Sequence, residues 1–170
     1  LSLTLTKHLT CCLHGARKSF LIFKELILRS DILKIYALTE QSKYWNATMD
    51  FAEKCSWKAG KFLARLMKEI KNWERVFVAI VDEKPIAYCT LAEKDELPEQ
   101  YSFSPFIGFV FVDEKYRGNR ISELLINEAF EYARTLEFQT VYIMSGEKGL
   151  YEKYGFTKIG NFETVYGTVD

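Results

Sequence analysis

The feature that most constrains the fold is a change of pattern between residues 105 and 136. Pro105–Val112 (PFIGFVFV) is a nearly continuous apolar run, which is typical of a strand covered on both faces. Arg120–Leu136 repeats its apolar residues at helical spacing and predicts an amphipathic helix. The turn between them, KYRGNR, contains three cations, Lys115, Arg117 and Arg120. The pattern predicts a strand, a tight turn and a helix in immediate succession.

The turn has the local chemistry of an anion site. A helix N-terminus offers free backbone N–H groups and a partial positive charge. Gly118 permits a positive φ, and Asn119 tolerates the same conformation. The cations of the turn add charge around those amides, as a pyrophosphate group requires. A solvated loop whose cations only offset Asp113 and Glu114 is the alternative interpretation.

The remaining pattern predicts one domain of mixed α/β (α+β) class. The expected strands are Ser2–Thr6, Arg75–Val81, Pro85–Glu93 and Gln139–Met144, with a closing pair that turns near Gly160-Asn161. The expected helices are Leu9–Arg29, Ile32–Ser42, Trp57–Lys71 and a short Glu147–Tyr154 that ends at Gly155. This order predicts a central mixed, twisted and mostly antiparallel sheet that is flanked by helices.

Composition excludes several classes of partner. Lys+Arg and Asp+Glu are 23 each, so the net charge gives no reason to expect nucleic acid or an anionic membrane. No window reaches the roughly 18 consecutive apolar residues of a membrane span, and no signal-peptide pattern is present. The four cysteines form no C-x-x-C pair and the chain has two histidines, so no metal site is expected. Free thiols favour a reducing, cytoplasmic location.

Two motifs, in order, resemble those of the GNAT superfamily of N-acetyltransferases. The unit FVFVDEKYRGNRISELLINEA is similar to motif A, where backbone amides of a Gln/Arg-x-x-Gly-x-Gly/Ala loop hold the pyrophosphate of acetyl-CoA. Downstream, GLYEKYGFTKIG is similar to motif B, where a short helix carries a tyrosine and ends at Gly-Phe. The resemblance implies a single domain over 1–170, with an acetyl-CoA-binding core at 75–160. Residues 1–72 would be its mainly helical acceptor-side part.

The resemblance implies which residues contact acetyl-CoA. They are Phe111, Val112, Arg117, Gly118, Asn119, Arg120, Ile121 and Ser122. Phe111 and Val112 would present backbone groups to the pantetheine arm. Arg120 stands where the family has glycine, and we expect the loop to reach the phosphates without a positive φ there. Its guanidinium can itself bind phosphate through a bidentate fork.

The resemblance also assigns candidate catalytic residues. Tyr151 matches the motif B tyrosine that protonates the departing CoA thiolate, and Tyr154 is its rival. The central strand carries no carboxylate, so Glu93 at the end of the neighbouring strand is the candidate general base. Asp95 and Glu96 come next, and a reaction without a protein base is the remaining alternative.

The implied function is transfer of an acetyl group from acetyl-CoA to a primary amine by direct attack. The acetyl group would lie where the central strand splays from the next one. The acceptor is a small molecule or a peptide, and homodimer formation is left open. A non-catalytic acyl-CoA-binding or sensor domain on the same fold is the alternative, because of Arg120 and the missing strand carboxylate. An unrelated nucleotide-binding protein is disfavoured, since its glycine-rich patterns are absent.

Overall fold

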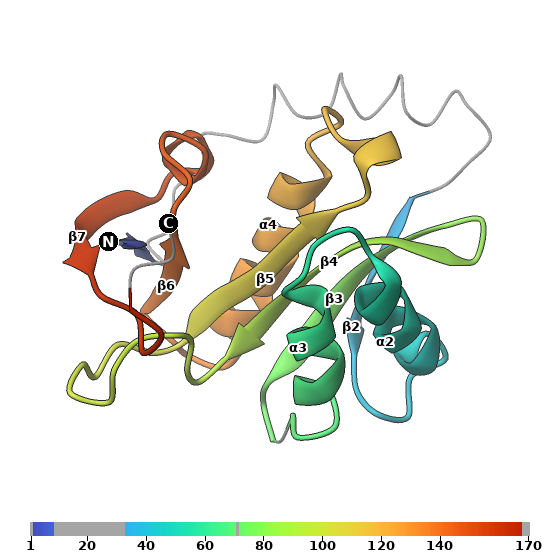
Figure 1. Cartoon of the computed structure of the whole chain (residues 1–170), viewed down its shortest axis with the longest axis horizontal. Helices are drawn as coiled ribbons and strands as arrows, with labels where there is room; N and C mark the ends of the chain where they lie inside the picture. Colours follow the sequence, from blue (N-terminus) through green and yellow to red (C-terminus); the bar gives the residue numbers. More distant parts are fainter. Residues whose placement is uncertain (1, 9–32, 71, 168–170) are drawn as a thin grey trace.

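One seven-stranded sheet, in the order β2-β3-β4-β5-β6-β1-β7, runs through the protein (Figure 1). The computed structural model describes residues 2–8, 33–70 and 72–167, so the helix expected at Leu9–Arg29 lies outside it. The strands are β1 (Ser2–His8), β2 (Lys34–Leu38), β3 (Arg75–Val81), β4 (Lys84–Ala92), β5 (Phe106–Val112), β6 (Thr140–Ser145) and β7 (Thr157–Phe162). The helical elements are α2 (Trp45–Lys54), α3 (Gly60–Leu66), α4 (Ile121–Thr135) and the 3-10 turns η1 (Glu114–Tyr116) and η2 (Tyr151–Tyr154).

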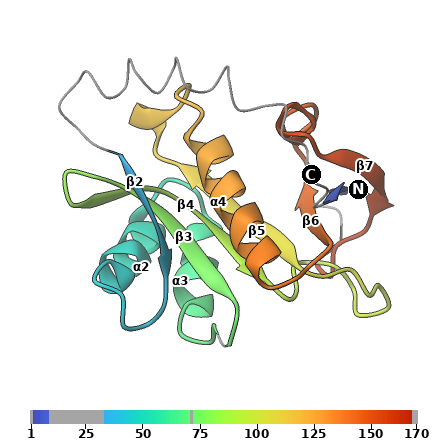
Figure 2. The same ribbon diagram turned by 180° about the vertical axis from the view of Figure 1, so that it is seen from behind.

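Helices cover both faces of the sheet. α4 packs along one face against β3, β4 and β5, whereas α2 and α3 lie on the other face (Figures 1 and 2). β3 and β4 are therefore buried on both sides, which explains their continuous apolar sequences. All neighbouring strands are antiparallel except β5 and β6, which are parallel. The mixed, mostly antiparallel sheet expected from the sequence is confirmed.

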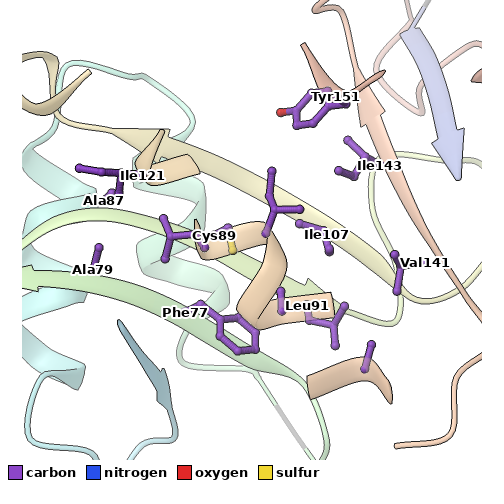
Figure 3. Packing of buried hydrophobic residues seen from close by; sticks show 14 of the residues in the cluster. Phe77, Ala79, Ala87, Cys89, Leu91, Ile107, Ile121, Val141, Ile143 and Tyr151 are labelled. Atoms are coloured by element: carbon purple, nitrogen blue, oxygen red, sulfur yellow. The ribbon is translucent and has the colours of Figure 1, made fainter. Parts of the chain in front are cut away.

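Two hydrophobic clusters fill the space between the layers. The cluster under α4 includes Phe77, Cys89, Ile107 and Leu125, and it ends at Tyr151 beside Ile143 (Figure 3). The cluster under α2 and α3 joins Leu63 and Met67 to Tyr88 and Phe111, among others. Burial raises the pKa of the Cys89 thiol, so this cysteine is a core residue and not a nucleophile.

The helix expected at Ile32–Ser42 is wrong, because this segment contains strand β2. Lys34–Leu38 pairs with β3 in antiparallel register, from Lys34 opposite Ile80 to Leu38 opposite Val76. A run as short as KIYAL fits the residue spacing of a helix and that of a strand equally well. The exposed edge of β3 decides the outcome, since strand propensity depends on available neighbours.

The other boundaries also shift through tertiary contacts. The closing hairpin is wrong: β7 runs straight through Gly160 and Asn161 and pairs with β1. The expected helix Trp57–Lys71 shortens to α3, and Glu147–Tyr154 shortens to η2. Gly155 caps η2 with φ 87°, as the sequence predicted.

Gly60 is a position where the packing of α2, α3 and β4 can be tested. A Cβ added there would lie 2.2 Å from the Ala52 carbonyl oxygen and 2.6 Å from Cys55 Sγ. We expect Gly60→Ala to lower the free energy of unfolding by about 3 kcal/mol, because backbone cannot yield as a side chain can. Gly146→Ala, which has nothing within 4 Å, is the matched control in a urea titration. Equal midpoints for the two variants would contradict this packing.

Candidate active site

The centre of the site is a break in the pairing of β5. On one side β4 pairs along the strand, but two residues, Phe109 and Val110, face the single Cys89. Phe109 has φ 48°, a left-handed conformation that costs a non-glycine residue about 1 kcal/mol. Such bulges are frequent next to active sites, where they redirect the strand.

On its other side, β5 diverges from β6. The two strands share one register pair, Phe106 with Tyr142, and beyond it no β6 residue pairs with β5. Figure 1 shows the two ribbons separating toward their C-terminal ends, with β5 leading to the turn before α4. The strand edge between Gly108 and Val112 is therefore left without a strand partner, as the divergence predicted from the sequence requires.

The register decides what Phe111 and Val112 present to this edge. Asp113 N donates to Ile86 O at 2.9 Å. In the alternating antiparallel pattern, the backbone N–H and C=O of Phe111 therefore point toward β4, and those of Val112 point into the gap between β5 and β6. The Val112 carbonyl accepts a hydrogen bond from Arg117 Nε at 3.1 Å. Phe111 contributes its ring instead, which stacks on Tyr88.

The turn before α4 forms an open N-terminus. Gly118 has φ 80°, and nothing lies within 4 Å of the place where a Cβ would be. Arg120 is the N-cap of α4 with φ 57°, and no side chain caps the helix. The expectation that residue 120 needs no positive φ is therefore wrong. Arginine adopts the backbone conformation that glycine would adopt freely, because the turn into α4 requires it.

Two of the three cations of the turn, Arg117 and Arg120, are held by neighbouring carboxylates. Arg117 pairs with Glu114 at 3.0 Å, and its guanidinium lies 5.9 Å from the centre of the Phe111 ring. Arg120 forms a bidentate pair with Glu123, which raises the pKa of Arg120. Both side chains are drawn back from the amides of the turn, and the space over Gly118 stays open. The turn therefore fits a pyrophosphate group through backbone N–H donors and the helix dipole.

Two tyrosines of η2 lie near this turn. Tyr154 Oη is 3.0 Å from Ser122 Oγ in the first turn of α4, and Lys7 Nζ donates to the Tyr154 carbonyl at 2.8 Å. Tyr151 is buried, and its burial raises its pKa to about 12 against an opposing hydrogen bond with Ser145. Tyr151 therefore stays protonated at neutral pH and can only donate a proton.

The carboxylate best placed at β5 is Asp95. Its Oδ2 would lie 3.2 Å from a Cβ on Gly108, and Thr90 Oγ1 would lie 3.4 Å from the same point. Glu96 N donates to Asp95 Oδ1 at 2.8 Å, and no basic side chain of the described residues pairs with Asp95. Burial raises the pKa of Asp95 to about 6. This carboxylate lies on the α2 and α3 side of the sheet, beside the bulge.

The other carboxylates considered from the sequence lie farther from β5. Glu93 and Glu96 are exposed, and the Glu93 N–H donates to Glu74 Oε1 at 2.9 Å. Sequence reasoning ranked Glu93 first because it ends β4. The signal for Asp95 was Gly108, since a glycine inside an apolar strand marks a place where another group approaches closely.

Trp57 closes the site toward the helices. Its ring stacks on Phe111 with centroids 6.2 Å apart and meets Phe109 edge-on at 6.2 Å. Its side chain remains 38% exposed, so it is part of a wall and not of the core. Tyr44 and Trp45, by contrast, are buried in the cluster under α2 and α3.

Residues 33–156 match the model of the Acetyltransferase (GNAT) family. This match covers most of the chain, and it contains the bulged strand, the glycine turn and η2. The chain belongs to this family of acetyltransferases. It is thus an acyltransferase with acetyl-CoA as its acetyl donor, as the two motifs predicted. The comparison with curated proteins gave no match.

Solved structures share the fold at low identity. AAC(6')-Iy in complex with the bisubstrate analogue CoA-S-monomethyl-acetylneamine is 12% identical, with a TM-score of 0.62 over 76% of this chain and 94% of that one. A predicted acetyltransferase from Clostridium acetobutylicum with acetyl-CoA is 15% identical, with a TM-score of 0.57 over 77% and 94%. Glucosamine-6-phosphate N-acetyltransferase from Arabidopsis thaliana is 15% identical, with a TM-score of 0.56 over 78% and 97%.

Two further observations concern the described part of the chain. None of its helices has the length and apolar character needed to cross a membrane. Within the same residues, no three His, Cys, Asp or Glu side chains gather into a group that could hold a metal ion.

Replacement of Arg120 tests how the turn holds phosphate. We expect Arg120→Gly to leave the acetyl-CoA dissociation constant within about threefold, because the amides, and not the guanidinium, provide the contacts. Arg120→Val should lower Tm by about 2 to 6 °C, since a β-branched residue tolerates positive φ poorly. Calorimetry and thermal unfolding measure the two effects. A loss of affinity above tenfold in Arg120→Gly would instead assign the phosphate contact to the arginine.

Proposed function

We propose that this protein is an N-acetyltransferase that acts on a primary amine by direct attack, in the cytoplasm. The observation that carries the proposal is the unpaired edge of β5, with a proton donor and a partly buried carboxylate near it. Free cysteines support the location. Residues 1–72 of the single domain would contribute the acceptor side, where Trp57 and α3 lie. The similar structures of AAC(6')-Iy with a CoA-acetylneamine analogue and of glucosamine-6-phosphate N-acetyltransferase support an amine acceptor. We also propose that the protein can form a homodimer.

The cofactor fits the open turn. Acetyl-CoA supplies a thioester whose carbonyl carbon accepts the amine and whose thiolate then departs. The N–H groups at Gly118 and after it would hold the pyrophosphate, while Val112 would contact the pantetheine arm. The open edge of β5 would orient the acetyl group by hydrogen bonds, which supports catalysis mainly through positioning and polarisation.

Tyr151 is the proposed general acid. A protonated phenol can donate to the sulfur that gains negative charge, and its raised pKa keeps it protonated over the physiological range. Its burial against Phe156 and Tyr154 fixes the ring, so the hydroxyl needs no reorganisation.

Asp95 is the proposed base, ahead of Glu93. A partly buried carboxylate without a cationic partner among the described residues attracts the ammonium form of the acceptor and accepts its proton before or during attack. Thr90 would help to hold the amine over Gly108. Glu93 remains a second candidate, and the two differ in what they contact: the Asp95 carboxylate lies next to Gly108 of β5, whereas the Glu93 side chain is exposed.

Removal of the Tyr151 hydroxyl tests the acid. We expect Tyr151→Phe to lower kcat by about 100-fold with little change in KM for acetyl-CoA, because the donor acts in the transition state. The comparison is with Tyr154→Phe, measured by release of the CoA thiol. A larger loss in Tyr154→Phe than in Tyr151→Phe would transfer the role to Tyr154. Unchanged turnover in both would remove tyrosine from the mechanism.

The pH dependence tests the base. The raised pKa of Asp95 means that the carboxylate is ionised above about pH 6 and protonated below it, so kcat/KM should fall as pH decreases through this value. Asp95→Asn should lower kcat/KM by about 100-fold for the same acceptor and should remove the fall of kcat/KM at low pH (the acid limb of the pH profile). Glu93→Gln is the matched control variant and should retain both the wild-type kcat/KM and the acid limb of its pH profile. Loss of the limb in Glu93→Gln alone would assign the base to Glu93.

A further inference from the structure

The outward face of α3 carries cations for which the proposed reaction has no use. Lys58, Lys61 and Arg65 line a surface hollow of about 350 Å³ together with Phe62. Lys61 and Arg65 are four positions apart on one side of α3, away from the buried Leu63, and Lys58 lies in the turn just before the helix.

These cations are unpaired within the part of the chain that the structure describes. No ion pair of the described residues involves Lys58, Lys61 or Arg65, whereas Arg117, Arg120 and Arg134 all have carboxylate partners. The chain as a whole has equal numbers of acidic and basic residues, so this positive charge is local. It points to an anionic ligand.

An exposed ring lies among these cations. Phe62 is 59% exposed, and the Arg65 guanidinium lies 5.9 Å from its ring centre. This ring lines the same hollow as the cations, so a ligand held there by charge would also contact an apolar surface. We call Lys58, Lys61, Phe62 and Arg65 the α3 patch.

The α3 patch is joined to the candidate active site by Trp57. This residue directly precedes Lys58, and its ring packs on Phe109 and Phe111 of the bulged strand. Asp95 lies on the same side of the sheet. A ligand reaching from Asp95 to α3 would therefore meet a carboxylate at one end and cations at the other.

We infer that the acceptor is an acidic peptide, with its amine at Asp95 and its carboxylates on the α3 patch. This inference rests on the proposed function. Lys61 and Arg65 are four positions apart on α3, which is roughly 6 Å along the helix, and Lys58 extends the row of cations into the turn before it. Such a spread of cations suits several carboxylates in a chain better than one anionic group, and it repels a polycationic acceptor.

Three peptides of equal length test this inference. Each has the same free amine, and the residues that follow are glutamate, glutamine or lysine. We expect kcat/KM for the glutamate peptide to exceed that for the glutamine peptide by about tenfold at low salt, with the lysine peptide lowest. Raising the ionic strength toward 1 M should remove most of the difference, because exposed charges are then screened.

Charge reversal identifies the surface. The double variant Lys61→Glu with Arg65→Glu should lose the preference for the glutamate peptide, and its kcat/KM for the lysine peptide should rise. Lys158→Glu, at an exposed position of β7, is the control and should retain the wild-type order. Equal rates for the three peptides, or an order unaffected by the double variant, would overturn the inference.

Binding separates this inference from the proposed function. Calorimetry with CoA present should show the glutamate peptide binding about tenfold tighter than the glutamine peptide, whether or not transfer occurs. Absence of thiol release with every amine would defeat the proposed function alone, and equal binding of the peptides would defeat the inference alone. A phosphorylated amino sugar that outcompetes the glutamate peptide, and depends on Arg65, would also overturn it.

Discussion

The divergence of β5 from β6 is the constraint on which the rest of the site depends. A strand in the middle of a sheet normally satisfies its backbone groups on both sides, whereas β5 pairs with β6 only at Phe106. The bulge at Phe109 turns the strand further, at the cost of a left-handed phenylalanine. The core compensates for this cost, since Ile107 and Phe111 are buried in different clusters on the two faces. The open edge is thus held rigidly, which suits a group that must polarise a carbonyl.

Electrostatics on the two sides of this edge differ in a way that matters for chemistry. Near the start of α4, the arginines are drawn onto Glu114 and Glu123, so the helix amides face an open space. Across β5, Asp95 has no cationic partner among the described residues, and Tyr151 is too deeply buried to ionise near neutral pH. An anion is therefore favoured at the N-terminus of α4 and a cation beside β5. The pyrophosphate of acetyl-CoA is such an anion, and the ammonium form of an amine is such a cation.

Much of the fold could be predicted from the sequence because local pattern and tertiary environment agree there. Arg75–Val81 is apolar throughout because both of its faces are buried, and Gly155 ends η2 because a left-handed cap was needed. Strand β2 could not be predicted, since its pairing depends on the free edge of β3. The hairpin expected at Gly160 failed for a similar reason, because β1 competes for the strand.

The site was predictable where a motif carries it and not where distant segments meet. The positive φ of Gly118 could be predicted from its neighbours in sequence, although the positive φ of Arg120 could not. Asp95 lies in a polar loop, and only the fold brings its carboxylate onto Gly108. Nothing in the local pattern distinguishes it from Glu93, because burial is a property of the packed molecule.

The central claim is that the open edge of β5 supports acetyl transfer and not merely CoA binding. The most direct measurement is thiol release from acetyl-CoA over a broad panel of primary amines, with the acetylated amine identified by mass spectrometry. The account predicts release that depends on the amine and yields one acetylated product per thiol. Acetyl-CoA binding in calorimetry without thiol release for any amine would contradict it and would favour a non-catalytic acyl-CoA-binding domain.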